Sequence, residues 1–512
     1  MDRAQRGDWW SRPWLLVAVV LLTALPLLWP TVPPLVDLLG HMGRYHVQLG
    51  IGQDPQLARW YSFEWAVIGN LGVDLLVEPL APLLGLEHAV KLIVALIPPL
   101  TAAGLLWIAH EVHHRLPPTA FLAVPLVYNY PLFFGFANFS LAMAFVFVAF
   151  GLWLHLARRG RLALRAAIFP VIAVLIWITH AFGWGTLGVL CFSAELIRQH
   201  DRGRRWHRAL IPTAIGVLPL TPPILLMLLW RGGGDAGGMT GGWFAMEAKL
   251  AYFGMILRDR WAGFDILGMV VLIVALRAAL VDRRLELSRH LAISAVFLLG
   301  VYLLLPRIVF GSAYADMRLA PYMLAVAVIG IRLTPAATAR FAGALAVAAL
   351  LFLGVRLGGN FWSAVLYDRA FTRELAALDH VPPGSTLVTL VGKRCVEGWW
   401  RSRLDHIPGM ALVRRGAFAN DQWEAAGAQL LRVTFDEARP FVSDPSQLVT
   451  FQQCRRERWL PISRALPAIR RDLFDHVWIV DAPPFDPRLL DGMTPVWRRG
   501  RSLVLRIDRP AR

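Results

Sequence analysis

The sequence predicts a mainly α-helical fold: a polytopic transmembrane helical bundle followed by a smaller carboxyl-terminal soluble α/β domain. Apolar runs recur through residues 1–357 with lengths near the ~20 helical residues needed to cross ~30 Å of hydrocarbon. Hydrophobic residues make up 56% of the 512 residues, and the mean hydropathy is +0.51. From about Gly358 the long runs give way to short ones bounded by Gly, Pro or Asp, a pattern typical of strands.

The apolar runs predict about eleven spans and the orientation of the chain. The spans are expected at residues 14–30, 89–109, 118–134, 138–156, 164–181, 183–197, 209–230, 263–281, 290–306, 317–333 and 341–357. Arginines gather in alternate short loops, which is typical of the cytoplasmic side. The amino terminus is therefore expected inside the cell and the carboxyl-terminal domain outside. The first run lacks a small-residue cleavage pattern, so we expect it to be retained as an anchor.

The net charge of +17 raises nucleic acid as a partner, because basic patches neutralise phosphates. Lysine occurs only at positions 91, 249 and 393, so nearly all of the excess charge is arginine. Those arginines lie in short loops between apolar runs, where they orient a membrane protein. The sequence excludes nucleic acid and predicts membrane lipids as neighbours.

Two segments between spans are expected on the outer side. The first, residues 31–88, is long and contains apolar stretches at 37–50 and 62–85 that are interrupted by charges and prolines. Such stretches are typical of helices that lie along the membrane interface. The second, residues 231–242, is rich in glycine, follows no predicted strand and is expected to be flexible.

The tail, residues 358–512, is long enough for one soluble α/β domain. Helical spacing is expected over 366–379, and strands are expected at 386–391, 477–480 and 503–507. Cys395 and Cys454 face the oxidising side in the predicted topology, where a disulfide is permitted.

Asp37 follows the first span and heads the most informative motif of the chain. In a helix, Asp37, His41 and Arg44 would share one face and bring a carboxylate, an imidazole and a guanidinium together at the membrane surface. Asp37 is therefore a candidate general base whose charge His41 and Arg44 would shape. The alternative is a helix N-cap after Pro33 and Pro34.

Three more polar side chains lie at span ends. His180 ends the fifth span, where a ring is costly unless it is partnered, used or anchored at the interface. Arg307 and Arg318 flank the turn between the ninth and tenth spans and could hold a phosphate. The alternative for either arginine is a local ion pair with Asp316.

Asp74 and Glu78 form a like-charge i, i+4 pair in an apolar stretch, which is unfavourable unless something compensates. They are candidates for contacting an acceptor or a divalent cation, Mg or Mn, the one cofactor that the sequence leaves open. The alternative is that Asp74 and Glu78 lie on the water-facing side of a helix at the membrane interface.

The segment His110-Glu111-Val112-His113-His114 matches the zinc-protease pattern H-E-x-x-H at the end of a span. A membrane-embedded zinc metalloprotease would need a third protein ligand, and no motif in a later span supplies it. A polar helix end at the inner interface is the simpler interpretation.

Taken in order, these residues resemble the C-type (GT-C) glycosyltransferases. The matching pieces are the run from Asp37 to Arg44, the run beginning at Asn70, Gly135-Phe136-Ala137-Asn138-Phe139, His180, and Asp316-Met317-Arg318. The resemblance covers most of residues 10–330. One departure is that many members carry paired acidic residues where Asp37 is followed by leucine.

The resemblance implies an inverting enzyme of the bacterial inner membrane with a periplasmic carboxyl-terminal domain. It would move a sugar from a polyprenyl-phosphate donor to a glycan, lipid or protein acceptor of the cell envelope. Asp37 would act as the base with His41, and Arg318, Arg307, His180 and Arg44 would hold the donor phosphate. A non-catalytic lipid-binding or scaffold protein with the same fold is the alternative.

Overall fold

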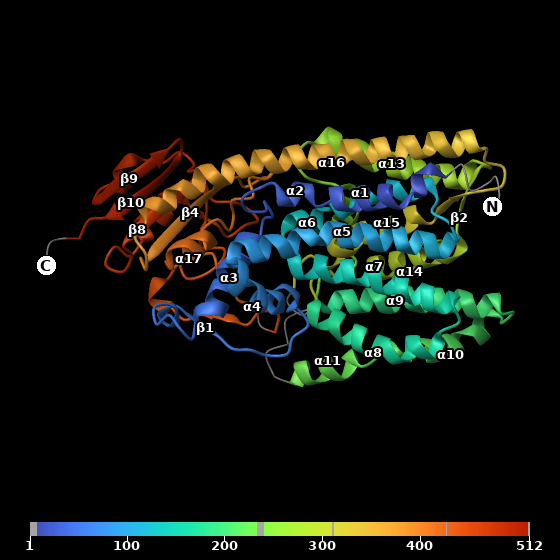
Figure 1. Ribbon diagram of the computed structural model, residues 1–512. Helices are drawn as coiled ribbons and strands as arrows, with labels where there is room; N and C mark the ends of the chain where they lie inside the picture. The colour runs from blue at the N-terminus through green and yellow to red at the C-terminus, as the bar shows by residue number, and fades with distance from the viewer. Residues whose placement is uncertain (1–7, 233–239, 310–311, 426, 510–512) are drawn as a thin grey trace.

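The computed structural model describes residues 8–232, 240–309, 312–425 and 427–509. The chain forms an elongated helical bundle with a β-sheet at one end, and its amino-terminal end lies at the opposite end (Figure 1). The chain is mainly helical, as predicted, and the sheet is confined to the carboxyl-terminal part apart from three short strands.

The α-helices are α1 (Pro13–Leu22), α2 (Leu25–Leu28), α3 (Leu38–Gly50), α4 (Gly72–Leu84), α5 (Leu86–His113), α6 (Tyr130–Phe134), α7 (Ala137–Arg158), α8 (Leu162–Thr179), α9 (Ala181–Asp201), α10 (Trp206–Val217), α11 (Pro223–Gly232), α12 (Met246–Gly254), α13 (Ala262–Val281), α14 (Arg289–Leu304), α15 (Ala315–Ile329), α16 (Ala339–Leu375), α17 (Gly409–Arg415) and α18 (Ile462–Ala465). The strands are β1 (Tyr61–Phe63), β2 (Leu285–Leu287), β3 (Ile331–Leu333), β4 (Leu387–Lys393), β5 (Leu431–Val433), β6 (Leu448–Thr450), β7 (Leu460–Pro461), β8 (His476–Val480), β9 (Met493–Arg499) and β10 (Ser502–Ile507).

Five helices of the described residues are long and apolar enough to cross a membrane: α5, α7, α8, α13 and α16. They match the spans predicted at 89–109, 138–156, 164–181, 263–281 and 341–357. The span predicted at 209–230 is a pair of helices bent by 65°, which makes a sixth candidate if the pair is one span. Those predicted at 14–30 and 290–306 are shorter apolar helices, so the count of eleven is not confirmed.

Two further predicted spans, 183–197 and 317–333, lie in helices that do not join this set. Helix α9 ends in a polar stretch that includes Glu195 and Arg198. Helix α15 has 15 residues and would cover only about 22 Å at 1.5 Å per residue. The end of the predicted tenth span is instead strand β3, which pairs antiparallel with β2.

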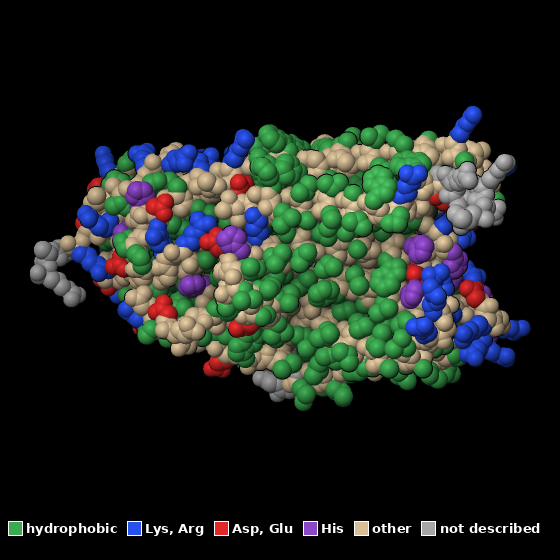
Figure 2. All heavy atoms as spheres, viewed as in Figure 1, with side chains coloured by type: hydrophobic (Ala, Val, Ile, Leu, Met, Phe, Trp, Pro, Cys, Tyr) green, Lys and Arg blue, Asp and Glu red, His purple; other side chains and the backbone are tan. Residues whose placement is uncertain are grey.

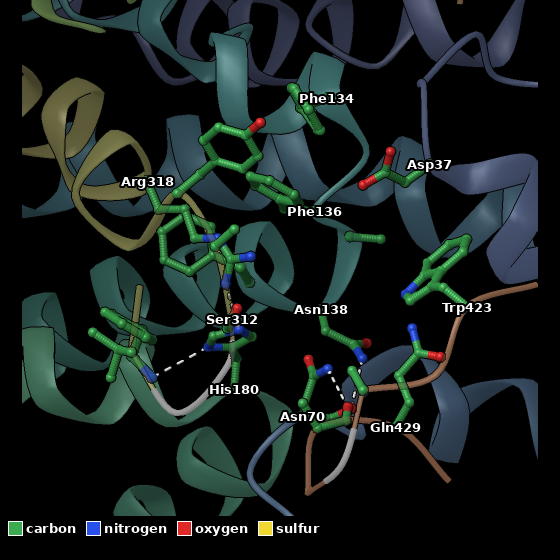
Figure 3. Close-up of a pocket in the computed structure, with 18 of the residues that line it drawn as sticks. Asp37, Asn70, Phe134, Phe136, Asn138, His180, Ser312, Arg318, Trp423 and Gln429 are labelled. Carbon is green, nitrogen blue, oxygen red and sulfur yellow. Dashed lines mark hydrogen bonds between the residues drawn. The ribbon is translucent and has the colours of Figure 1, made fainter. Parts of the chain in front are cut away.

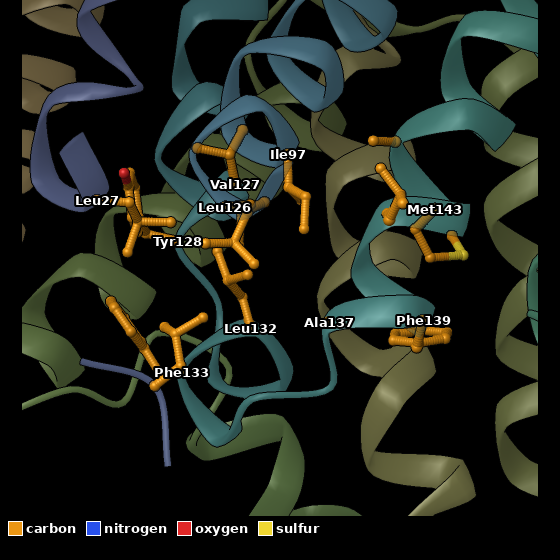
Figure 4. Packing of buried hydrophobic residues seen from close by; sticks show 14 of the residues in the cluster. Leu27, Ile97, Leu126, Val127, Tyr128, Leu132, Phe133, Ala137, Phe139 and Met143 are labelled. Carbon is orange, nitrogen blue, oxygen red and sulfur yellow. The ribbon is translucent and has the colours of Figure 1, made fainter. Parts of the chain in front are cut away.

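The prediction of a span at 118–134 is wrong. The segment forms two 3₁₀ turns, Pro118–Leu122 and Val124–Val127, and the short helix α6. Pro117, Pro118, Pro125 and Pro131 lack the amide hydrogen that a continuous helix requires at those positions. The side chains are nevertheless buried, and Leu126, Val127 and Leu132 pack in the bundle core (Figure 4). Irregular backbone of this kind is tolerated within a bundle because neighbouring protein covers it.

A six-stranded mixed sheet occupies the carboxyl-terminal part, in the order β7-β6-β4-β8-β10-β9. Strands β7, β6, β4 and β8 run parallel, and β10 and β9 are antiparallel to their neighbours. β4, β8 and β10 are the three strands that the sequence predicts. All five residues of β8, His-Val-Trp-Ile-Val, are buried, which suits a central strand covered on both faces.

The 31–88 segment is part of the same body as the tail. Strand β1 pairs antiparallel with β5, with Tyr61 opposite Val433. The Tyr61 hydroxyl donates to the Ala419 carbonyl at 2.9 Å, and Trp60 packs against Phe418 with ring centroids 5.9 Å apart. The first segment between spans therefore supplies core residues and a strand to the sheet-bearing end.

Helix α3 packs against α17 of the tail at close range. A Cβ atom at Gly43 would lie 3.3 Å from the Cα atom of Gly409, so the two backbones approach where both residues are glycine. This contact fixes the start of α3 relative to the tail.

Helix α16 spans 37 residues and crosses the boundary predicted at residues 357/358 without a break. The helix expected over 366–379 is therefore the continuation of the last span rather than a separate element. A buried ion pair between Arg356 and Asp265, at 3.0 Å, joins α16 to α13. Figure 1 shows α16 running from the bundle to the sheet.

The surface has an apolar belt over the bundle. In Figure 2 hydrophobic side chains cover the middle of the visible face, while basic, acidic and histidine side chains gather at the two ends. Exposed leucines and valines on several helices, such as Leu229, Leu280 and Leu351, form part of this apolar surface. A belt of this kind is expected where lipid contacts a membrane protein.

Candidate functional site

A cavity of about 1030 Å³ lies where the helical bundle meets the sheet-bearing end. Its walls come from parts of the chain far apart in the sequence. The polar and aromatic side chains that line it include Asp37, His41, Asn70, Phe136, Asn138, His180, Tyr314, Arg318, Lys393, Glu397, Arg401, Asp405, His406, Trp423, Gln429, Asp444 and Trp459. Figure 3 shows Asp37 and Arg318 in this cavity, with Phe136 between them in that view.

The backbone of Asp37 is held by the end of α6 and by Gly135, which follows it. The amides of Val36 and Asp37 donate to the carbonyls of Phe133 and Phe134 at 3.1 and 3.0 Å. Gly135 has a φ of +100°, and a Cβ atom there would lie 2.6 Å from the Asp37 nitrogen. Only glycine therefore fits this turn without displacing Asp37.

Asp37 occupies the N-cap position of α3, but within the described chain its side chain makes no capping hydrogen bond. The carboxylate instead faces the cavity and is 16% exposed. Burial raises the pKa of Asp37 to about 7, and Asp444 and Asp405 add to this, while His406 and Arg318 oppose it. A carboxyl group that titrates near neutral pH is suited to accept a proton.

His41 and Arg44 do not act together as the helix pattern suggests. His41 lines the cavity beside Trp423, with ring centroids 4.9 Å apart. Burial, together with the charges of Arg44, His406 and Arg318, holds the pKa of His41 well below its usual value, so its ring is neutral. Arg44 is buried and points away to form a two-pronged ion pair with Asp74, and it does not line the cavity.

Asp74 and Glu78 also lie outside the cavity lining. Asp74 is fully buried and accepts from Arg44 and, at 3.1 Å, from Asn138. Glu78 accepts from Gln48 at 2.7 Å. In the described ranges no group of three or more His, Cys, Asp or Glu side chains is arranged to hold a metal ion. The positive charge of Arg44 therefore offsets the free-energy cost of burying the Asp74 carboxylate.

Arg318 enters the cavity from the first turn of α15. It is 7% exposed, its Nη1 lies 3.3 Å from Nε2 of His180, and its guanidinium lies 4.1 Å from the centroid of the Phe136 ring. Its Nε makes no hydrogen bond, and no carboxylate within 4 Å pairs with it among the residues that the structure describes. The structure therefore brings Asp37, His180 and Arg318 to one cavity and leaves Arg318 with donors to offer.

Arg307 does not line the cavity and lies beside Tyr314, 5.1 Å from its ring centroid. Asp316 pairs with neither arginine; it accepts from Lys249 at 3.2 Å and from the Met317 amide at 2.9 Å. The alternative interpretation, a local ion pair between Asp316 and either arginine, is therefore wrong, because Asp316 pairs with buried Lys249 of α12.

The H-E-x-x-H segment ends α5, and its glutamate is already engaged. Glu111 accepts from Arg158 at 2.6 Å and from Trp107 at 3.1 Å, and lies 3.0 Å from His155. His113 lies 2.8 Å from the carbonyl of Ile329. These contacts describe a polar helix end rather than a carboxylate free to activate water.

The tail supplies a whole wall of the cavity, which the sequence does not predict. Lys393 pairs with Asp405 at 2.9 Å, and His406 lies 3.9 Å from the Asp37 carboxylate. Cys395 and Cys454 are joined in a disulfide, which links the segment containing Lys393 to the one containing Trp459. No sequence pattern marks Asp405 and His406, because they come from a loop with no regular spacing, and Lys393 is the last residue of β4.

Residues 233–239 of the predicted glycine-rich 231–242 loop lie outside the described residues. Gly242 is described, and its carbonyl accepts from the amide of Arg307 at 3.2 Å.

No protein-family model matches the chain, and no curated protein sequence matches it significantly. The chemistry of the cavity is therefore the basis for any assignment.

Proposed function

We propose that the chain is a membrane glycosyltransferase of the GT-C type, which transfers a sugar from a polyprenyl-phosphate donor to an acceptor hydroxyl. The observation that carries this proposal is the single cavity lined by Asp37, His180 and Arg318. It places a carboxyl group poised near neutral pH in the same space as an arginine without a carboxylate partner.

The composition of the cavity suits a donor with a lipid tail and a charged head. Besides the polar residues, one part of its lining is apolar and comes from the bundle. These apolar residues are Val189, Met227, Leu298, Val301 and Leu305. An apolar surface next to Arg318 matches a hydrocarbon chain that ends in phosphate.

The proposed reaction is a direct displacement at the anomeric carbon. Asp37 takes the proton of the acceptor hydroxyl, whose oxygen forms a bond to the anomeric carbon and inverts it. The bond from that carbon to the phosphate oxygen breaks, and its electron pair leaves with the polyprenyl phosphate. Arg318 stabilises this anion, and His180 positions the guanidinium; such preorganised charge is usually the largest catalytic contribution.

The tail wall is where the acceptor would bind. Trp423 and Trp459 offer flat apolar faces, and Glu397, Asp405 and Asp444 offer hydrogen-bond acceptors. Under this proposal the acceptor is a glycan, lipid or protein of the cell envelope, and the tail lies on the periplasmic side of a bacterial inner membrane.

The test is complementation of a strain that lacks this chain. Mass spectrometry of surface glycans and glycolipids should show a missing sugar in the deletion strain, restored by the parent chain. Asp37→Asn keeps the shape of the side chain and removes the base, so it should fail to restore the sugar although the protein is present in the membrane. Loss of a general base typically lowers a rate by about 10²–10⁴-fold.

If Asp37→Asn restores the glycan as well as the parent, the proposed mechanism is wrong and a non-catalytic scaffold or lipid-binding role is supported. Unchanged glycans and glycolipids in the deletion strain would contradict the proposal as a whole.

A further inference from the structure

His406 brings a second charged group to the Asp37 carboxylate from the other end of the chain. It precedes α17 and is buried between two carboxylates. Its Nε2 lies 3.9 Å from Oδ1 of Asp37, and its Nδ1 lies 3.6 Å from Oδ2 of Asp421. The order Asp421, His406, Asp37 thus runs from the tail core to the cavity.

Asp421 and the backbone hold this arrangement in place. Asp421 is fully buried and accepts from the amide of Gly409, the first residue of α17, at 3.0 Å. Gln422 donates to the carbonyl of Gly40 in α3 at 3.2 Å. The ring of His406 packs against Trp423, with centroids 4.7 Å apart. The imidazole is therefore fixed by the contact between α3 and α17.

The charged groups nearest to His406 among the described residues come from several parts of the chain. Asp444 lies 4.0 Å from its Nε2, and Asp405, the preceding residue, is paired with Lys393. The neutral ring of His41 packs against the same Trp423 ring as His406 does, and the positive charge of Arg318 acts on Asp37 from the bundle. Carboxylates outnumber cations near the imidazole.

This surplus of negative charge decides the protonation state of the ring. Burial disfavours the imidazolium, but Asp421, Asp444 and Asp37 outweigh it and raise the pKa of His406 to about 10. His406 is therefore positively charged at neutral pH and lowers the pKa of Asp37 against the effect of burial.

We propose that His406 is a positioning residue through which the carboxyl-terminal part of the chain keeps part of the Asp37 population ionised at neutral pH. The role of Asp37 as base rests on the proposed function, whereas the electrostatic coupling of the two residues does not. Without His406 the carboxyl group would remain protonated at neutral pH and could not accept a proton. The tail is then an integral part of the active site.

The test follows the carboxylic acid band of Asp37 by infrared spectroscopy during a pH titration of the full chain in detergent. The band is assigned by its loss in Asp37→Asn, and the parent midpoint is expected at about 7. His406→Gln keeps a polar side chain and removes the charge, so the midpoint should rise by one pH unit or more, about a tenfold change in the proton affinity.

Asp444→Asn is the matched control, because it removes a neighbouring negative charge instead of a positive one. Its midpoint should move down, opposite to that of His406→Gln. A purely structural role for His406 would not produce shifts of opposite sign. Should His406→Gln fail to fold, His406→Asn is the substitute, with an upward shift expected.

An unchanged midpoint in a folded His406 variant overturns the inference. This titration needs no substrate, so it separates the two proposals. If the midpoint shifts as expected while Asp37→Asn still restores the glycan, the coupling stands and the proposed function fails. If the midpoint does not shift while Asp37→Asn fails to restore the glycan, the proposed function stands and the role of His406 is wrong.

Discussion

Arg318 is the residue whose environment is least like that of a structural arginine. Of the five other arginines buried in the described ranges, four pair with carboxylates, such as Arg44 with Asp74 and Arg356 with Asp265. The fifth, Arg258, donates to the backbone carbonyls of Trp399 and Gly398. Arg318 has His180 and aromatic faces instead. Burying an arginine without a carboxylate is costly, so a ligand anion is the natural partner.

Replacing Arg318 with Gln should therefore lower sugar transfer by about 10²–10³-fold, the usual loss when one donor to a developing anion is removed. Arg307→Gln is the matched control, because Arg307 lies at the same turn but outside the cavity. The measurement is the glycan readout of complemented strains, followed by the rate of transfer once the sugar is known. Equal losses in both variants would contradict the assignment of Arg318.

The raised pKa of Asp37 has a consequence for stability. The pKa of Asp37 is about 7 in the folded protein and 3.8 in the unfolded chain, so protonation of this carboxyl group stabilises the fold. The stabilisation is complete below pH 3.8 and is lost as the pH rises through 7. Asp37→Asn should therefore melt at a higher temperature than the parent above pH 7, and at a similar temperature near pH 3.8. The check is thermal unfolding of both proteins in detergent across this range. A difference that does not change with pH would mean that the pKa of Asp37 is not raised.

At the residue scale, the sequence could indicate Asp37, His180 and Arg318 because each is an isolated polar residue beside an apolar span. The sequence could not show that Arg44 and Arg307 lie outside the cavity, since the direction of each side chain depends on packing. His406 could not be predicted at all. Its partner Asp37 lies in another region of the sequence, and the segment around His406 has no periodicity.

Among the elements, the turn at Gly135 is the one that positions the site most directly. Gly135→Ala should lower stability by about 1–2 kcal/mol, the cost of a side chain at positive φ, and should also lower sugar transfer because the new Cβ displaces Asp37. Thermal unfolding and the glycan readout measure the two effects separately.

Gly160 provides the control for this substitution. It has a φ of +69°, and nothing lies within 4 Å of a Cβ built there. Gly160→Ala should therefore show the same kind of strain without loss of transfer. Loss of transfer in both variants, or in neither, would mean that the Gly135 contact does not position Asp37.

At the element scale, long uninterrupted apolar runs were sufficient to predict α5, α7, α8, α13 and α16, because each is a continuous helix. The run at 118–134 was misleading, since its mean hydropathy is high although its prolines interrupt the helix. Strands such as β1, β5 and β7 have three residues or fewer. Their formation depends on pairing between distant segments, which local sequence does not encode.

At the scale of the whole molecule, the tail shares its core with a distant segment of the chain. Its core includes Val47, Leu57, Trp60 and Tyr61 from the 31–88 segment. We predict that a fragment beginning at residue 376 will lack cooperative unfolding and bind a hydrophobic dye, because Phe418 and Phe435 lose their cover. Joining residues 37–63 to the fragment through a flexible linker should restore a cooperative transition in near-ultraviolet circular dichroism.

The same joined fragment with Trp60→Ala should show a weaker cooperative transition, since Trp60 is 1% exposed and contacts both Phe418 and Phe435. A cooperative transition in the tail alone would show that the shared core is unnecessary. The sequence suggested a boundary at residue 358 because composition changes there, but composition cannot reveal that a distant segment completes a core.

Because α16 is one unbroken helix, at 1.5 Å per residue it measures about 55 Å from end to end. About 30 Å of that length suffices for the hydrocarbon, so the remainder is a stiff support for the sheet. The distance from the membrane-crossing part of α16 to the sheet is consequently a fixed dimension of the protein, not one set by a flexible linker. Under the proposed function, a lipid carrier would deliver its head group to a site held at a set distance from the membrane, and inserting helical residues into α16 would change the position of the sheet by about 1.5 Å per residue.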